Sequence, residues 1–230
     1  MLIKMFSLTI NIDMLANDIG EPDFCHYLQC FLQDYLEPDV TSLPFFLLTS
    51  EKDYIHSSAT TSFYAPSDIC GTRGMRHEHM HVVTSWRCGK PQYDCVFINI
   101  DKHKLGMFRL SIAHARLFFS IKVNCIKHSC ALVHWYYGLR DSVDENTGMW
   151  VVEPDILDDG RHQTAVIHLD MIVCLGHLFP IYGEQAPKGV MYMDSLDIFS
   201  TFYVNKFTDR HVLKSCSNSY YLYPLIILST

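Results

Sequence analysis

Apolar residues recur with a helical period near the start of this chain. From Phe24 to Leu36 they follow the i, i+3, i+4, i+7 spacing of an amphipathic helix, in the segment FCHYLQCFLQDYL. Pro22 and Asp23 stand at the start of this segment, and EPDV follows its end, as is typical of helix boundaries. We therefore predict a helix over Phe24–Leu36.

From His81 to Gly183 the pattern changes to short runs rich in Val, Ile, Phe, Tyr and Trp. The runs are HVVTSW, YDCVFINI, ARLFFSIKV, CALVHWYY, GMWVVEP, TAVIHLDMIV and HLFPIYG, separated by turn segments such as DSVDENTG and PDILDDGRH. These separations leave no room for crossover helices, so the strands are expected to pair antiparallel. The predicted class is α+β and β-rich: a small antiparallel barrel or curled sheet, whose order of runs resembles that of BAH-like or SH3-like barrels.

A second helix is predicted after the strands, so that one helix precedes and one follows the sheet. Asp194 and Asp197 frame its first turn like a capping pair. Its apolar face would consist of Leu196, Phe199, Tyr203 and Phe207.

The expected organisation is one β-rich domain over residues 22–211, after a poorly defined segment 1–21 and before an apolar tail, 212–230. The apolar run near the N-terminus is too short for a secretory signal. The last stretch, YYLYPLIILST, is interrupted by Pro224 and is too short to span a bilayer. We expect no membrane partner. An uncovered apolar tail is expected to favour aggregation, so that deleting Tyr220 to Thr230 would raise solubility.

Composition narrows the function classes. The chain has 230 residues, 49% of them hydrophobic, and a net charge of -7, which repels phosphate backbones and disfavours tight autonomous DNA binding. Its nine cysteines are an odd number, and several lie in apolar runs, which indicates a reducing compartment such as the cytoplasm.

Over roughly Pro22 to His211 the chain contains, in this order, FYAPSD, GMRHEHM, SWRCGKPQYDCVFIN, CALVHWY, DENTGMWVVEPD, AVIHLDMIV, HLFPIYG and SLDIFSTFYVNKFTDRH. This series resembles the C-terminal region of the plavaka or KDZ type transposon-encoded proteins of mushroom-forming fungi. The resemblance implies a nuclear, non-catalytic tail, because the family's nuclease core lies upstream and no catalytic residue carries over. The two ends depart from the family pattern, which suggests a truncated or decayed copy.

Three alternate histidines form the first candidate site. His77, His79 and His81 share one face if they lie in a strand, and Cys70 or Cys88 would complete a zinc tetrahedron. The spacing matches no usual zinc motif, and the family carries Arg at some of these positions. We therefore predict a polar strip with no metal and no cofactor.

The same region is locally basic. Arg73, Arg76, Arg87 and Lys90 stand against a single acid, Glu78, and such segregated charge is what contact with DNA phosphates would need. The alternative is a solvated surface.

Aromatic residues of the later strands form a third candidate. Trp135, Tyr137 and Trp150 would build a cage for a methylated ammonium group in a chromatin-reader module. Strand aromatics at alternate positions are more often core, and both interpretations stay open.

Catalytic motifs are weak in this sequence. We find no G-x-S-x-G elbow and no glycine-rich phosphate loop, and the carboxylates fall in turns. Hydrolysis through Asp158, Asp159 and Asp170 is the least implausible activity. Cys25 and Cys30 would point to different faces of the first helix, while Cys125 and Cys130 flank a hairpin turn.

The predicted function is therefore that of a non-enzymatic accessory segment making protein or DNA contacts, with no small-molecule substrate. The alternatives are a chromatin reader and a decayed reading frame without selected function.

Overall fold

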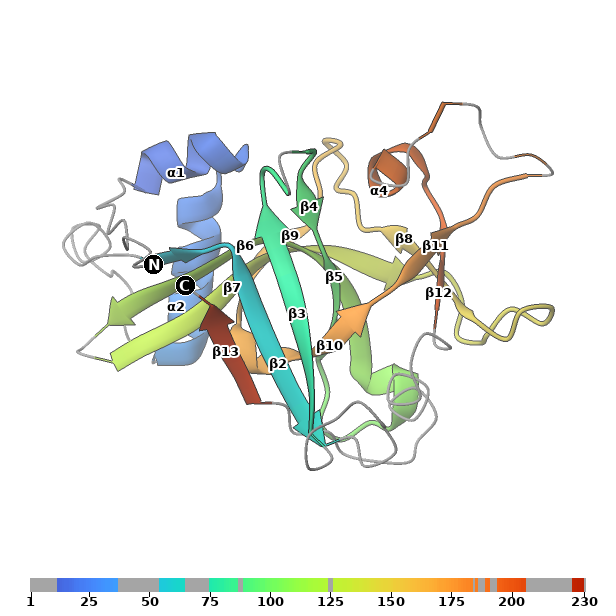
Figure 1. The fold of residues 1–230 in the computed structure, drawn as a ribbon, viewed down its shortest axis with the longest axis horizontal. Helices are drawn as coiled ribbons and strands as arrows, with labels where there is room; N and C mark the ends of the chain where they lie inside the picture. Colours follow the sequence, from blue (N-terminus) through green and yellow to red (C-terminus); the bar gives the residue numbers. More distant parts are fainter. Residues whose placement is uncertain are drawn as a thin grey trace.

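The computed structural model describes residues 12–36, 54–64, 75–86, 89–123, 126–183, 185, 189–190, 194–205 and 225–229. Within these ranges the chain is β-rich, with antiparallel strands and few helices (Figure 1). The predicted class, a β-rich chain with an antiparallel barrel-like sheet, is confirmed.

The main sheet closes almost completely into a barrel. Its path runs β10 (Ile172–Gly176), β5 (Cys95–Asn99), β6 (Leu110–Val123), β7 (Ile126–Gly138), β8 (Trp150–Pro154), β12 (Phe202–Val204) and β11 (Leu178–Pro180). Only His177 separates β10 from β11. One bent strand therefore pairs with β5 at one end and with β12 at the other, and it joins the two ends of the sheet.

Alternate residues of these strands fill the barrel, as the two-residue period of a strand requires. The interior cluster contains Cys95, Phe97, Ile112, Tyr136, Val152, Cys174, Phe202 and Val204. Tyr136 and Phe202 meet edge to face, with ring centroids 5.9 Å apart. Each barrel strand except the short β11 gives at least one buried side chain to this cluster.

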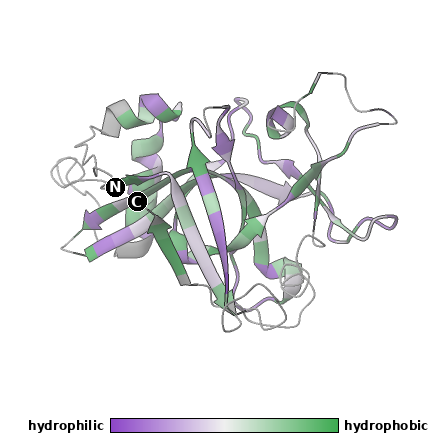
Figure 2. Ribbon diagram, viewed as in Figure 1, coloured by the Kyte–Doolittle hydropathy of each residue, from purple (hydrophilic) through white to green (hydrophobic). Residues whose placement is uncertain are grey.

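A smaller sheet covers one outer face of the barrel. Its order is β13 (Leu225–Ser229), β2 (Ser58–Tyr64), β3 (Met75–Val83) and β4 (Gln92–Tyr93). Hydrophilic and hydrophobic segments alternate along β3 (Figure 2): Met80 and Val82 point towards the barrel, while His79 and His81, which alternate with them, point away. Met80 and Phe118 belong to the core between the two sheets.

Two further strands belong to the main sheet but lie off this path. β1 (Tyr54–His56) pairs with β6, and β9 (Thr164–His168) pairs with β7. Short 3-10 turns, η1 (Gly106–Arg109) and η2 (Leu169–Met171), precede β6 and β10.

Two helices cover the part of the sheet formed by the second half of β6 and the first half of β7. α2 (Phe24–Leu36) lies where the helical period placed it, and its buried residues Phe24, Leu28 and Leu32 pack on the sheet. α1 (Ile12–Ile19) lies inside the segment 1–21 that was expected to be poorly defined, and Leu15 joins the same cluster. Gly20, at φ +73°, ends α1, in a conformation that glycine adopts at no steric cost.

The second predicted helix is wrong beyond its first turn. α4 covers only Ser195–Ile198, and Tyr203 lies in strand β12. Phe202 and Val204 are both fully buried in the barrel, and β12 pairs with β8. This pairing and burial outweigh the weak helical spacing of the same residues. Phe207 lies outside the described residues.

The last described residues belong to the smaller sheet. β13 pairs with β2 from Leu225 to Ser229, and Ile226 and Leu228 pack against the core between the sheets. This part of the apolar tail is therefore paired and packed in the sheet.

A chain ending at Pro224 is expected to lose about 2 to 4 kcal/mol of unfolding free energy, because two partly buried aliphatic side chains leave the core. Urea denaturation measures this loss. Ile227→Ser is the control, since Ile227 is exposed, and it should change stability by no more than about 0.5 kcal/mol. Unchanged stability with raised solubility after the truncation would restore the uncovered-tail prediction.

Candidate functional site

The candidate site is a groove at the mouth of the barrel, where two chain segments diverge. Gly176 of β10 and Cys95 of β5 form the last pair of their ladder. Before Cys95 the chain turns towards β3 as β4, and after Gly176 the bent strand turns towards β12 as β11. The fork between them holds a cavity of about 420 Å³. We call it the fork groove.

Both walls and the floor of the fork groove contain apolar side chains. It is lined by Trp86, Lys90, Pro91, Gln92, Tyr93, Asp94, Cys95, Gly176, His177, Leu178, Phe179, Ser195 and Leu196. Leu178 and Leu196 also pack against the barrel interior, so the floor is continuous with the core. Trp86 and Phe179 are exposed at its edges.

An ion pair bridges the two sides of the fork groove. Lys90 Nζ lies 2.7 Å from both carboxylate oxygens of Asp194, which immediately precedes α4. Asp94, which also lines the groove, accepts hydrogen bonds from the main-chain N–H and the ring of His81, and from the side chain of Gln92. These contacts fix the polar side of the groove.

A row of buried polar side chains crosses the sheet beside the fork groove. Cys95, His114, His134 and Thr164 are successive cross-strand partners on β5, β6, β7 and β9, and all four are buried. Glu21, from the connection between α1 and α2, accepts a hydrogen bond from His134 Nε2 at 2.6 Å. The loop before α2 is thereby tied to the barrel.

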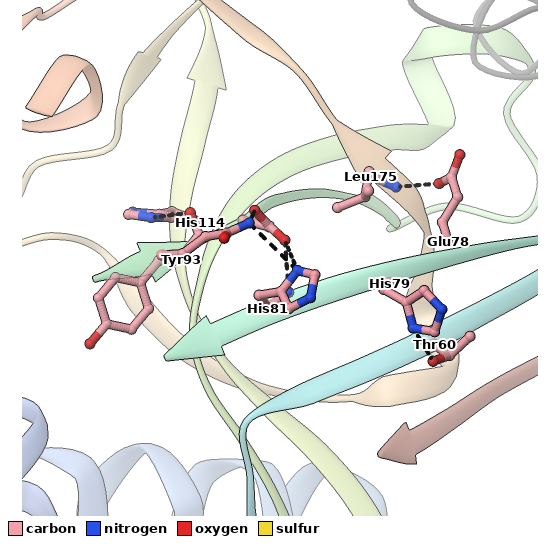
Figure 3. Close-up of polar contacts among 9 residues, drawn as sticks. Thr60, Glu78, His79, His81, Tyr93, His114 and Leu175 are labelled. Carbon is pink, nitrogen blue, oxygen red and sulfur yellow. Dashed lines mark hydrogen bonds and ion pairs between the residues drawn. The ribbon is translucent and has the colours of Figure 1, made fainter. Parts of the chain in front are cut away.

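Two further contacts complete this histidine row. The ring of His162 stacks on His134 at 4.5 Å with an interplanar angle of 12°. His114 Nε2 donates to the carbonyl oxygen of Tyr93 at 3.1 Å (Figure 3). The row therefore connects the strands at the mouth of the barrel with α2.

Burial shifts the pKa values of His114, His162 and Cys95. Burial lowers the pKa of His114 to about 3. The positive charge of Arg116 and the neighbouring His134 act in the same direction. Burial, followed by His134, also lowers the pKa of His162. Burial raises the pKa of the Cys95 thiol well above its usual range. These groups are uncharged near neutral pH and act as packing and hydrogen-bonding groups.

The three histidines weighed as zinc ligands lie together on the outer face of β3, and each has its own partner. His77 Nδ1 is 2.7 Å from the Ser62 hydroxyl, and His79 Nδ1 is 3.0 Å from that of Thr60. His81 pairs with Asp94 (Figure 3). In the described ranges no three metal-ligating side chains converge, and the other two candidates, Cys70 and Cys88, lie outside those ranges.

The described members of the basic strip are neutralised by carboxylates. Arg76 lies 3.3 Å from Glu78, whose other oxygen accepts the main-chain N–H of Leu175. Lys90 is paired with Asp194. Arg73 and Arg87 lie outside the described residues.

The three candidate cage residues are not brought together. Trp135 and Tyr137 point to one face of β7, and Trp135 packs against the core between the sheets. Trp150 points to the other face, where it packs against the barrel interior and lies edge to face with Phe108, at 5.5 Å. The sheet therefore separates Trp150 from the other two rings.

Two of the three candidate acids have local partners. Asp159 pairs with Arg161 in an exposed turn, Asp158 beside it is exposed, and Asp170 lies 3.3 Å from His168. Of the cysteines, Cys25 packs partly against the helix core and Cys30 is exposed, as expected for different helix faces. Cys130 is buried, and Cys125 lies outside the described residues.

Comparison with protein-family models, with curated proteins and with solved structures found no match to this chain. Among the described residues no helix is long and apolar enough to cross a membrane.

Proposed function

We propose that this chain is a non-catalytic interaction module that binds an extended segment of a protein partner in the fork groove. The observation that carries the proposal is the divergence of β4 and β11 after the pair Cys95 and Gly176. An added strand would enter the space between two strands that have separated. Small barrels commonly bind ligands at their mouths, where such irregularities occur.

The hydrogen-bond pattern of β11 supports strand addition. The carbonyl oxygen of His177 accepts from Asn205, and the N–H of Ile181 donates to Thr201. Because antiparallel pairs alternate between bonded and non-bonded positions, the main-chain groups of Leu178 face away from β12. They face the side on which an extended peptide would pair, and the apolar lining of the groove would receive its alternate side chains.

In this proposal the fold of the module is a BAH-like or SH3-like barrel. The module is the C-terminal part of a transposon-derived protein that acts in the nucleus. Its partner is another protein or chromatin. DNA contact is the weaker proposal, because Arg76 and Lys90 already pair with carboxylates. A reading frame for a nuclease core just upstream in the genome would support the origin, and its absence would count against it.

Selection of a displayed library of short random peptides on the full chain tests the groove. Peptides that bind wild type are expected to bind Leu178→Pro at least tenfold more weakly, because proline removes the donor facing the groove and leaves the ladder to β12 intact. Isothermal titration of the enriched peptides measures the change.

Leu178→Val is the matched control, since it keeps the main-chain N–H, and it should retain the peptide affinity. Thermal denaturation of both variants checks that the barrel remains folded. Phe108→Ala, an exposed aromatic away from the groove, should also leave binding unchanged. Peptides that bind Leu178→Pro as tightly as wild type, or a library that yields no binder, would reject the proposal.

A further inference from the structure

A second cavity, of about 830 Å³, lies between α1 and the sheets, and Tyr93 is the one described residue that it shares with the fork groove. Its aliphatic side chains come from α1, β1, the end of β3 and β6: Leu15, Ile19, Ile55, Val82, Val83 and Leu117. Its polar lining includes hydroxyls of Ser57, Thr84 and Ser85, with Arg116 and Tyr93. The cavity thus combines an apolar body with one cationic group.

Arg116 reaches this cavity because the sheet is irregular at that position. The register between β6 and β7 shifts between Ala115 and Leu117, so Arg116 lies in a β-bulge. On the other edge of β6, β5 pairs as far as His114 and β1 begins only opposite Phe118. Bulges commonly redirect a side chain out of the regular ladder, and this one lies at a gap between two neighbouring strands.

The guanidinium of Arg116 packs on an aromatic ring and has one donor without a partner among the described residues. Its Cζ atom lies 4.4 Å from the centroid of the Tyr93 ring. Its Nε atom is buried and has no hydrogen-bond partner among the described residues. A buried donor without a partner is costly, and a bound acceptor would remove that cost.

We propose that this cavity binds a small organic carboxylate with an apolar body, whose carboxylate pairs with the guanidinium of Arg116. The planar guanidinium matches a carboxylate through two parallel hydrogen bonds, and the aliphatic walls receive the apolar body. Asp18 also lines the cavity. With one guanidinium and one acid among its lining residues, the cavity suits a singly charged carboxylate better than a doubly charged phosphate. The hydroxyls of Ser57 and Thr84 also line the cavity and are further donors.

Octanoate is the probe, titrated into the full chain and followed by calorimetry and by amide NMR shifts. It is expected to bind at least tenfold more tightly than octan-1-ol and more tightly than acetate, because both the charge and the apolar body contribute. The largest shifts should fall on the residues lining the cavity. Arg116→Lys keeps the charge but loses the planar donor pair, so it should weaken octanoate binding about tenfold.

Arg140→Lys is the matched control, because Arg140 is exposed and does not line the cavity, and it should bind octanoate like wild type. Leu178→Pro should also bind it, which separates this inference from the fork groove. Equal affinity for octan-1-ol, full affinity in Arg116→Lys, or shifts confined to other regions would overturn the proposal. If octyl phosphate bound more tightly than octanoate, the preferred ligand group would be a phosphate and not a carboxylate. If Arg116→Lys fails to fold, the comparison of octanoate with octan-1-ol on wild type decides.

Discussion

Phe202→Ala is expected to lower the free energy of unfolding by about 3 to 5 kcal/mol, the usual cost of removing a buried phenylalanine. Phe202 is 0% exposed and lies on β12, between β8 and β11, in the barrel. The truncation would also remove its edge-to-face contact with Tyr136. Urea denaturation followed by circular dichroism measures the change.

Phe179→Ala is the matched control, since Phe179 lies on the neighbouring strand β11 but is 50% exposed. It should change stability by no more than about 0.5 kcal/mol. Equal, small effects of the two substitutions would mean that the interior of the barrel is not the core that stabilises the fold.

The second large effect is a loss of stability in acid that depends on His114. Its pKa lies near 3 in the folded chain against an ordinary value of 6.5, so the unfolded chain binds more protons between these pH values. Stability from this group is therefore complete above about pH 6.5 and falls towards pH 3, by at most about 1.4 kcal/mol per pH unit. Below pH 3 the contribution is constant.

His114→Gln should flatten this part of the pH profile, because glutamine does not titrate and its amide can still donate to the carbonyl of Tyr93. Urea midpoints between pH 7 and pH 4 compare the variant with wild type. His103→Gln, in an exposed loop, should leave the slope unchanged. A slope that persists in His114→Gln would show that other groups cause the acid loss.

Much of the fold follows from local pattern, and its closure does not. The runs around Val96 and Val133 form strands because their branched residues occur in short runs between turn segments. The pattern does not predict strand β12, because Phe199 and Tyr203 have the spacing of a helix, whereas burial in the barrel selects the alternation of Phe202 and Val204. The strand conformation of these residues depends on their pairing with β8 and β11, which the local sequence does not show.

The candidate sites depend even more on register. His114 and His134 face each other only because β6 and β7 pair in one register, and Glu21 reaches His134 across more than a hundred residues of sequence. The available signal was a single histidine inside each of two apolar runs, SIAHARL and ALVHWYY. Nothing in the sequence around Arg116, in the first of these runs, predicts the β-bulge that redirects its side chain.

The bent strand from Ile172 to Pro180 limits how the protein can be divided. Because its first half pairs with β5 and its second half with β12, a break at His177 would leave each half held by one neighbour only. New chain ends for a circular permutant belong instead in the exposed turn around Glu145. A split version of this protein should keep both halves of that strand in the same fragment.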